Sequence, residues 1–459
     1  MLLSTFVAIL QDWLSAFPQQ RSGRRAITQA LGALLALGRR TLSRALWALG
    51  QQNRDWSAHY KLLGRSRWNA DALFQPILHR ALPLCPGPYV VIAMDDTHIH
   101  KTGRKILSAF YQRDPLSPKF RFNLMWGLRF LHLTLLVPLY RSHPDAGPRS
   151  LPLRFLEVPA LKRPGKKAPA EQQAAFLEAV KQNNLSTQAV AALQGVREAV
   201  DRAGLPDRCL LAVGDGGFCN RTLFRAVLDG VQLLTRTRKD IRLCHRAPAG
   251  GQAFYAAQKF TPEQVRQDDS IPWQTAHIFH GGSFRDVRYK LVAEVYWQTG
   301  ACRRRLRLLV VAPTPYDSGK GKRKYYRDPA YLLTTDGEGE AEPLLQGYFD
   351  RWQIEVNHRE EKDTLGVGQA QVRNPCAVSR QPALVVAAYS ALLLAGLLVY
   401  GPYRTRDFPA LPKWRKKATR PSCLDLLTVL RKEIADQTAS QNLLPAGVDW
   451  KQLGLAAAA

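Results

Sequence analysis

Acidic side chains at three separate places in the chain could together bind divalent metal ions. Asp95 and Asp96 follow the apolar run PYVVIAM, and Asp215 follows the apolar run CLLAVG. Glu355 lies in the segment YFDRWQIEVNHREEK. Hard cations prefer oxygen ligands, and two of them about 3.5–4 Å apart can neutralise charge on the attacking and leaving oxygens of a phosphodiester. These acids therefore indicate metal ligands of a phosphoryl-transfer site, not general bases.

The segment around Glu355 has a regular spacing. Counted from Tyr348, the residues Arg351, Glu355 and Lys362 follow after three, seven and fourteen positions. On one continuous α-helix these four side chains would fall within a wedge about 60° wide. The spacing predicts a helix that presents an acid between basic and aromatic groups. A solvated amphipathic helix would also cluster charges, so the four-residue pattern carries the argument.

The side of this helix next to the face that carries Glu355 is predicted to be buried. The apolar residues on that side are Leu345, Phe349, Trp352 and Val356. Glu360 and Glu361 would lie off the face that carries Glu355.

The charge of the chain points to a polyanionic partner. Among 459 residues, 65 are Lys or Arg and 37 are Asp or Glu, which gives a net charge of +28. This excess is far larger than solubility requires, and it favours nucleic-acid binding.

The cysteines and histidines give no second metal site. The seven cysteines are scattered without a Cys-x-x-Cys pair, which is typical of a reducing compartment such as the cytoplasm. His98 and His100 form a His-x-His pair, but no third histidine or cysteine stands at metal-ligand spacing.

The elements that must position the acids follow an α/β order. We predict strands at 88–94, 121–140 and 209–215, a basic linker at 161–170, two helices within 170–203, a strand-rich region at 240–335, and helices at 341–365 and 381–400. Open α/β sheets place sites beyond the carboxyl ends of their strands. Asp95 and Asp215 are therefore expected to face one crevice.

Two apolar segments need a separate interpretation. Residues 382–400 are uncharged and nearly long enough to span a bilayer, but their Ala, Gly and Ser content favours a buried core helix. The N-terminal run MLLSTFVAILQDWLSAF carries Asp12 and lacks a basic start, so it indicates an amphipathic helix and not a signal peptide. We expect no membrane association.

Residues 22–68 read as short helices rich in arginine. A helix that breaks at Gly38 and a second helix that begins after Thr41 suit a helix-turn-helix. The second helix would offer basic and polar groups to DNA near its start, namely Arg39, Arg40, Ser43 and Arg44. A plain helical hairpin would explain the apolar spacing equally well.

The Tyr-x2-Arg-x3-Glu-x6-Lys spacing resembles the signature of a large group of bacterial insertion-sequence transposases in the DDE superfamily. The resemblance extends to Asp95-Asp96-Thr97, to Asp215-Gly216-Gly217-Phe218, to LLTRTRKD (233–240) and to LLTTD (332–336). It therefore covers most of the chain.

This resemblance implies a fold and a domain order. The fold class would be α/β, with an RNase H-like catalytic core interrupted by a β-rich insertion and an α-helical N-terminal DNA-binding domain. The domains would be a helical DNA-binding domain at 1–82, the two parts of the catalytic core at 83–239 and 336–405, the insertion at 240–335, and a C-terminal candidate for dimerisation at 406–459.

The resemblance also implies roles for individual residues. Asp95, Asp215 and Glu355 would hold two magnesium or manganese ions per active site. Adjacent strand residues face opposite ways, so only one of Asp95 and Asp96 can be the first ligand, and the family's Asp-x-Thr/Ser habit favours Asp95. The residues implied to contact DNA are Tyr348, Arg351 and Lys362, then Arg236, Arg238 and Lys239, and Trp297 or Trp273 as a stacking platform.

The implied function is cut-and-paste DNA transposition. Such an enzyme would bind terminal inverted repeats, cut and join DNA strands as a homodimer in a synaptic complex, and work at the bacterial nucleoid. Two alternatives remain open: a catalytically inactive, transposase-derived DNA-binding protein, and an RNase H-like nuclease without strand transfer. The presence of all three acids disfavours the first, and the spacing around Glu355 disfavours the second.

Overall fold

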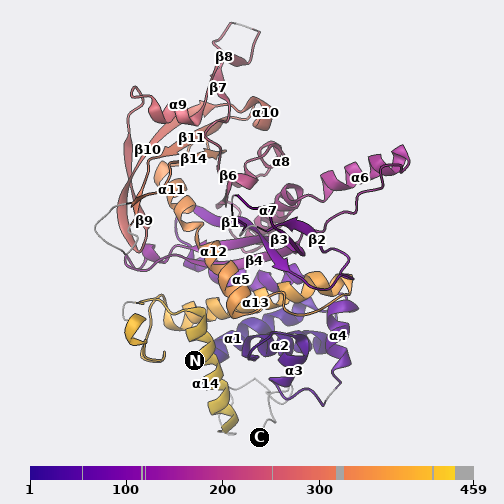
Figure 1. Cartoon of the computed structure of the whole chain (residues 1–459). Helices are drawn as coiled ribbons and strands as arrows, with labels where there is room; N and C mark the ends of the chain where they lie inside the picture. Colours follow the sequence, from indigo (N-terminus) through magenta and orange to yellow (C-terminus); the bar gives the residue numbers. More distant parts are fainter. Residues whose placement is uncertain are drawn as a thin grey trace.

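A mixed β-sheet forms the centre of the molecule (Figure 1). The computed structural model describes residues 1–53, 55–114, 117–118, 120–250, 252–316, 325–415 and 418–439. Within them the sheet has ten strands in the order β2-β3-β1-β5-β6-β14-β11-β10-β9, with β4 also paired to β3. The strand bounds are β1 Tyr89–His100, β2 Phe110–Arg113, β3 Leu124–Val137, β4 Arg149–Glu157, β5 Cys209–Gly214, β6 Val231–Arg236, β9 Gln274–His280, β10 Ser283–Val295, β11 Leu306–Val311 and β14 Ala330–Thr334.

The two strands that lead to the first acids are central and apolar. β1 and β5 run parallel, and β5 is buried along almost its whole length. Strands covered on both faces read as continuous apolar runs, which is why both were visible in the sequence. The prediction that the first strand stops at Asp95 is wrong, because β1 continues to His100 in antiparallel pairing with β3.

β4 is a strand that the sequence did not reveal. It contains Pro152 and the buried cations Arg149 and Arg154, which interrupt the apolar run by which a buried strand is recognised in a sequence. The pairing between β3 and β4 shifts register between Leu133 and Thr134, opposite Pro152. A proline lacks the amide needed by a regular ladder, so an irregularity at this position is expected.

The region 240–335 is rich in strands, as predicted, but it does not form a separate sheet. β9, β10, β11 and β14 extend the central sheet beyond β6. Two further pairs form small sheets of their own, β7 (Leu243–Arg246) with β8 (Tyr255–Phe260), and β12 (Pro315–Tyr316) with β13 (Tyr325–Tyr326). The short helices α9 (Pro262–Gln267) and α10 (Gln298–Ala301) complete this region.

The N-terminal residues form helices that share a core with the rest of the chain. These helices are α1 (Leu2–Gln11), α2 (Gln20–Leu35), α3 (Leu42–Trp47), α4 (Ser57–Gly64) and α5 (Gln75–Ala81). α1 to α4 lie below the sheet in Figure 1. α13 (Pro375–Tyr400) runs between them and β4, and one apolar cluster includes residues from all three parts. Residues 1–82 are therefore packed onto the sheet-bearing part through a continuous hydrophobic core.

α13 is the described helix that is long and apolar enough to cross a membrane. In its most apolar window, 83% of the residues are buried inside the structure. The side chains of Leu384, Val386 and Leu394 are 0–2% exposed. This burial agrees with the predicted core helix.

The remaining helices lie at the margins of the sheet or in the C-terminal part. α6 (Ala170–Gln182) and α7 (Leu185–Arg202) confirm the two helices predicted within 170–203, and α8 (Arg221–Arg225) follows β5. α14 (Cys423–Ala439) packs against α13 and α1, and Glu433 accepts hydrogen bonds from the amides of Leu2 and Leu3. Residues 440–459 lie outside the described residues.

Candidate active site

The first two acids lie side by side, Asp95 within β1 and Asp215 directly after β5. Met94 and Gly214 form the last parallel pair of β1 and β5, so Asp95 and Asp215 occupy the next position on adjacent strands. Asp215 begins a short 3-10 turn, and its Oδ1 accepts a hydrogen bond from the amide of Gly217 at 2.8 Å. Both acids line one pocket, as predicted, although β1 continues past Asp95.

Glu355 approaches the same place from a helix that is not continuous. α11 (Ala341–Asp350) ends before Arg351, α12 (Gln353–Arg359) begins after Trp352, and a π-helical turn follows at Glu360–Thr364. The prediction of one regular helix through Tyr348 and Lys362 is wrong. Trp352, predicted to be buried, is 61% exposed at the break.

A buried polar contact accompanies the end of α11. The carboxylate of Asp350 accepts hydrogen bonds from Tyr140 at 2.7 Å and from Gln346 at 2.8 Å. Burial raises the pKa of Asp350 to about 7, although both hydrogen bonds lower it. Tyr140 is 210 residues away in the chain, and no local pattern near Glu355 predicts this contact.

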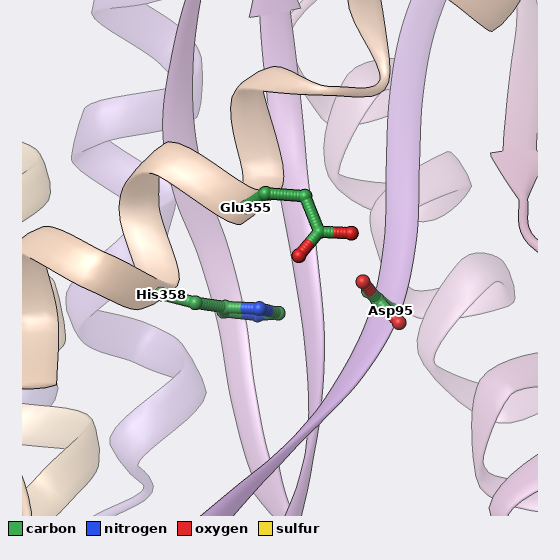
Figure 2. A group of neighbouring side chains, drawn as sticks. All are labelled: Asp95, Glu355 and His358. Carbon is green, nitrogen blue, oxygen red and sulfur yellow. The ribbon is translucent and has the colours of Figure 1, made fainter. Parts of the chain in front are cut away.

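Three side chains converge between β1 and α12 (Figure 2). One possible ligand atom from each of Asp95, Glu355 and His358 lies within 4.8 Å of the others. The Nη1 atom of Arg351 is 3.7 Å from Asp95 Oδ2 and 3.7 Å from Glu355 Oε1. The arrangement holds two carboxylates and an imidazole close together beside one guanidinium.

The surroundings of Asp95 disfavour the ionised form of its carboxyl group. Burial raises the pKa of Asp95 to about 7; the charges of Glu355 and Asp215 raise it too, and Arg351 opposes them. Burial also lowers the pKa of His358 to about 3, so its ring is neutral at physiological pH. A divalent cation would supply the charge that Asp95 lacks, and the oxygen donors fit a hard ion.

These groups line an open pocket of about 820 Å³. Asp95, Asp96, Asp215, Glu355 and Lys362 all border it. Burial lowers the pKa of Lys362, whereas Asp95 and Glu355 are among the nearby acids that raise it. Arg39, from the turn between α2 and α3, also reaches this pocket.

The structure distinguishes the two neighbouring aspartates. Asp95 lies opposite His132 in the β1–β3 ladder and faces α12. Asp96 instead accepts a hydrogen bond from Arg129 Nε at 2.7 Å, and its Oδ2 is 3.5 Å from His98 Nε2. The geometry therefore favours Asp95 as the ligand and gives Asp96 a partner of its own.

Several residues with predicted DNA roles lie away from the acids. Tyr348 packs beside Phe349 at the edge of an apolar cluster. Arg236, Arg238 and Lys239 border a different pocket of about 760 Å³, and Arg238 is paired with Asp240 at 2.5 Å.

The two candidate stacking residues are engaged inside the protein. Trp297 packs edge-on against Phe224, with ring centroids 5.7 Å apart. Trp273 lies beneath Lys290, whose Nζ is 4.8 Å from the ring centroid, and Arg288 also covers the ring. Both residues remain partly exposed, and the base-stacking role stays a prediction.

The predicted helix pair near Gly38 is present, but Arg40 and Arg44 differ in their contacts and exposure. Thr41 caps α3 by accepting a hydrogen bond from the amide of Arg44. The guanidinium of Arg40 donates to the carbonyls of Ala33, Leu34 and Thr364 at 3.1–3.2 Å. These bonds support a structural role for Arg40, and its DNA role stays a prediction, whereas Arg44 is exposed.

Glu360 and Glu361 were predicted to lie off the helix face that carries Glu355. Neither residue borders the pocket. Glu360 accepts a hydrogen bond from Tyr389, and Glu361 is 1% exposed beside His132.

Sequence reasoning missed His358. The residue follows Glu355 by three positions, and side chains three apart are neighbours on a helix surface. The Glu-x-x-His spacing is therefore a local signal that places His358 beside Glu355.

Comparison with known proteins gives one result. The family model of the DDE superfamily endonuclease matches residues 14–307. This range includes Asp95 and Asp215 and ends before Glu355. No curated protein matches the chain.

Proposed function

The chain belongs to the DDE superfamily endonucleases, and we propose that it is a cut-and-paste DNA transposase that binds terminal inverted repeats and catalyses strand cleavage and strand transfer. Membership implies metal-dependent nuclease activity on DNA. The observation that carries the finer proposal is the convergence of Asp95 and Glu355, with Asp215 at the equivalent position on the adjacent parallel strand.

We assign the three acids to two magnesium or manganese ions. Asp95 and Asp215 would hold one ion, and Asp95 and Glu355 would hold the other. When bound, such ions neutralise the attacking and leaving oxygens of the phosphodiester. Asp96 serves as a neighbour that orients Arg129 and not as a ligand.

The chain's basic residues bind and orient the DNA. Arg351 lies 3.7 Å from both carboxylates, where it holds Asp95 and Glu355 in place and can turn to a phosphate. Lys362 and Arg39 border the pocket and bring positive charge to the DNA backbone. Arg236, Arg238 and Lys239 extend this contact beyond the cut site, and Tyr348 is a further candidate for DNA contact.

The domain assignments belong to the same proposal. Residues 1–82 recognise the element end through α3, and the core of residues 83–239 and 336–405 is RNase H-like. Residues 240–335 form its insertion, and the C-terminal region 406–459 contributes to a homodimer. The protein acts in the cytoplasm at the nucleoid.

Glu355→Gln tests the proposal directly. The amide keeps the shape of the side chain but removes the charge that binds a cation, so magnesium-dependent nicking should fall at least about 100-fold while DNA binding persists. The substrate is an end-labelled duplex that carries the DNA flanking the gene. Glu342→Gln, at an exposed position of α11, is the matched control and should retain activity.

The outcomes separate the candidate functions. Full activity in Glu355→Gln would refute the metal-site assignment. Nicking by the wild type without joined products would favour a nuclease that lacks strand transfer. Binding without any magnesium- or manganese-dependent cleavage would favour the inactive DNA-binding protein.

A further inference from the structure

We propose that His358 is a nitrogen ligand of the ion held between Asp95 and Glu355, which makes this ion site prefer manganese over magnesium. The inference rests on the proposed function, because it assigns a further ligand to the same site. It concerns one of the two ion sites, the one away from Asp215.

The distances suit one ion. Candidate ligand atoms of Asp95, Glu355 and His358 lie within 4.8 Å of one another. Ligands bind hard divalent cations at about 2.0–2.6 Å, so two donors of one ion lie up to about 4–5 Å apart. Figure 2 shows the imidazole of His358 and the carboxylate of Glu355 extending from the same helix toward Asp95.

The ring of His358 is held in position by the fold. It projects from α12 one turn after Glu355, and its centroid is 5.1 Å from that of His132. His132 is fully buried and lies opposite Asp95 in the β1–β3 ladder. β3, which pairs with the strand that carries Asp95, therefore also contacts the imidazole of His358 through His132.

One ring nitrogen of His358 is buried without a hydrogen-bond partner among the described residues. The residue is 8% exposed, and its Nε2 has no hydrogen-bond partner among the described residues. Buried polar groups normally have partners, so an exception calls for a physical reason. A neutral imidazole in this position has a lone pair available for a cation.

An imidazole changes which ions the site favours. Magnesium strongly prefers oxygen ligands and retains waters, whereas transition ions accept imidazole readily. The pair of ion sites is therefore unequal. The site with Asp95 and Glu355 gains a nitrogen donor, whereas the residues that we assign to the other site, Asp95 and Asp215, are both carboxylates.

Pulsed electron paramagnetic resonance of bound manganese tests this inference. The full-length wild-type protein with Mn²⁺ should show hyperfine coupling from a directly bound ¹⁴N nucleus. Incorporation of ¹⁵N-labelled histidine should convert that signal to the ¹⁵N pattern. This measurement requires no variant, so it does not depend on whether a substitution folds.

His358→Gln identifies the residue responsible. The variant should lose the coupling and bind Mn²⁺ at least about 10-fold more weakly, while Mg²⁺ affinity changes by less than about 3-fold. His100→Gln is the matched control, because His100 borders the same pocket but is exposed and lies outside the ligand group. It should keep both the coupling and the affinity.

The possible failures are distinguishable. Manganese binding that is lost in Asp95→Asn, but shows no nitrogen coupling in the wild type, would overturn the role of His358 and leave the carboxylate site intact. Coupling that persists in His358→Gln would also overturn it. Absence of Mn²⁺ binding by the wild type would contradict the proposed function itself.

Discussion

Met94 lies directly opposite Gly214 in the last parallel pair between β1 and β5. The residue after each is an aspartate, so Asp95 and Asp215 lie side by side at the same level of the sheet. Glu355 is brought to that level by α12, which packs against β1. The candidate site thus depends on two strands and one helix that lie far apart in the chain.

The two neighbouring aspartates should respond differently to substitution. Asp95→Asn removes a carboxylate from the ligand group, so nicking with magnesium should fall at least about 100-fold. Asp96→Asn removes a partner of Arg129 and should reduce nicking less than about 10-fold. Initial rates on the same end-labelled duplex compare them. Loss in Asp96→Asn with activity kept in Asp95→Asn would move the first ligand by one residue.

The stability of the metal-free protein should fall as pH rises. The pKa of Asp95 is raised from 3.8 to about 7, chiefly by burial, so the folded state binds this proton more tightly than the unfolded state. Stability is therefore lost between about pH 4 and 7, as the buried carboxyl ionises. Asp95→Asn removes this penalty and should stabilise the protein by on the order of 3 kcal/mol at pH 8, but little at pH 4.

Chemical denaturation in the presence of EDTA measures this difference. Saturating Mn²⁺ is the control, because a cation bound only by the folded state should restore wild-type stability at pH 8. An Asp95→Asn advantage that is the same at pH 4 and pH 8 would contradict the assignment of the penalty to this carboxyl.

Substitution of Arg40 should lower the stability of the protein, whereas substitution of Arg44 should lower its affinity for DNA. Arg40→Ala leaves the carbonyls of Ala33, Leu34 and Thr364 without their donor, and we expect a loss of roughly 2–4 kcal/mol of stability. Arg44 is exposed, so Arg44→Ala should change stability by less than about 0.5 kcal/mol. If Arg44 contacts a phosphate, its removal should weaken DNA binding and reduce the salt slope by about 1.

Thermal unfolding and fluorescence anisotropy on a labelled duplex measure the two effects. Point variants suit this question better than removal of residues 1–82, because these residues share a continuous core with α13. Unchanged stability in Arg40→Ala would contradict the structural role and leave this residue a candidate for DNA contact.

DNA binding should depend strongly on salt. The net charge of +28 implies many phosphate contacts, and each contact releases counterions. With six to ten contacts, affinity should fall by about 10³-fold or more between 50 and 200 mM salt. Anisotropy titrations at several salt concentrations give the slope. A nearly flat dependence would remove the argument from charge.

The sequence by itself determined the strands that carry the first two acids. Their apolar runs are long because both faces of central parallel strands are covered, and Asp215 directly after the second run marks the carboxyl end of β5. The buried helix at 382–400 and the helix break at Gly38 were also readable, because composition and glycine placement act locally.

Only the tertiary structure decided which side chains meet. Arg40 reaches Thr364 across 324 residues, Tyr140 meets Asp350 across 210, and neither contact leaves a local signal. The helix breaks between α11 and α12 and continues into a π-helical turn. Tyr348 and Lys362 therefore do not share the single helix face that was predicted for them. His358 joined Asp95 because α12 packs on β1, and that packing depends on a core assembled from distant segments. Periodicity reports which face of an element is buried, but the partner on that face is chosen by the whole fold.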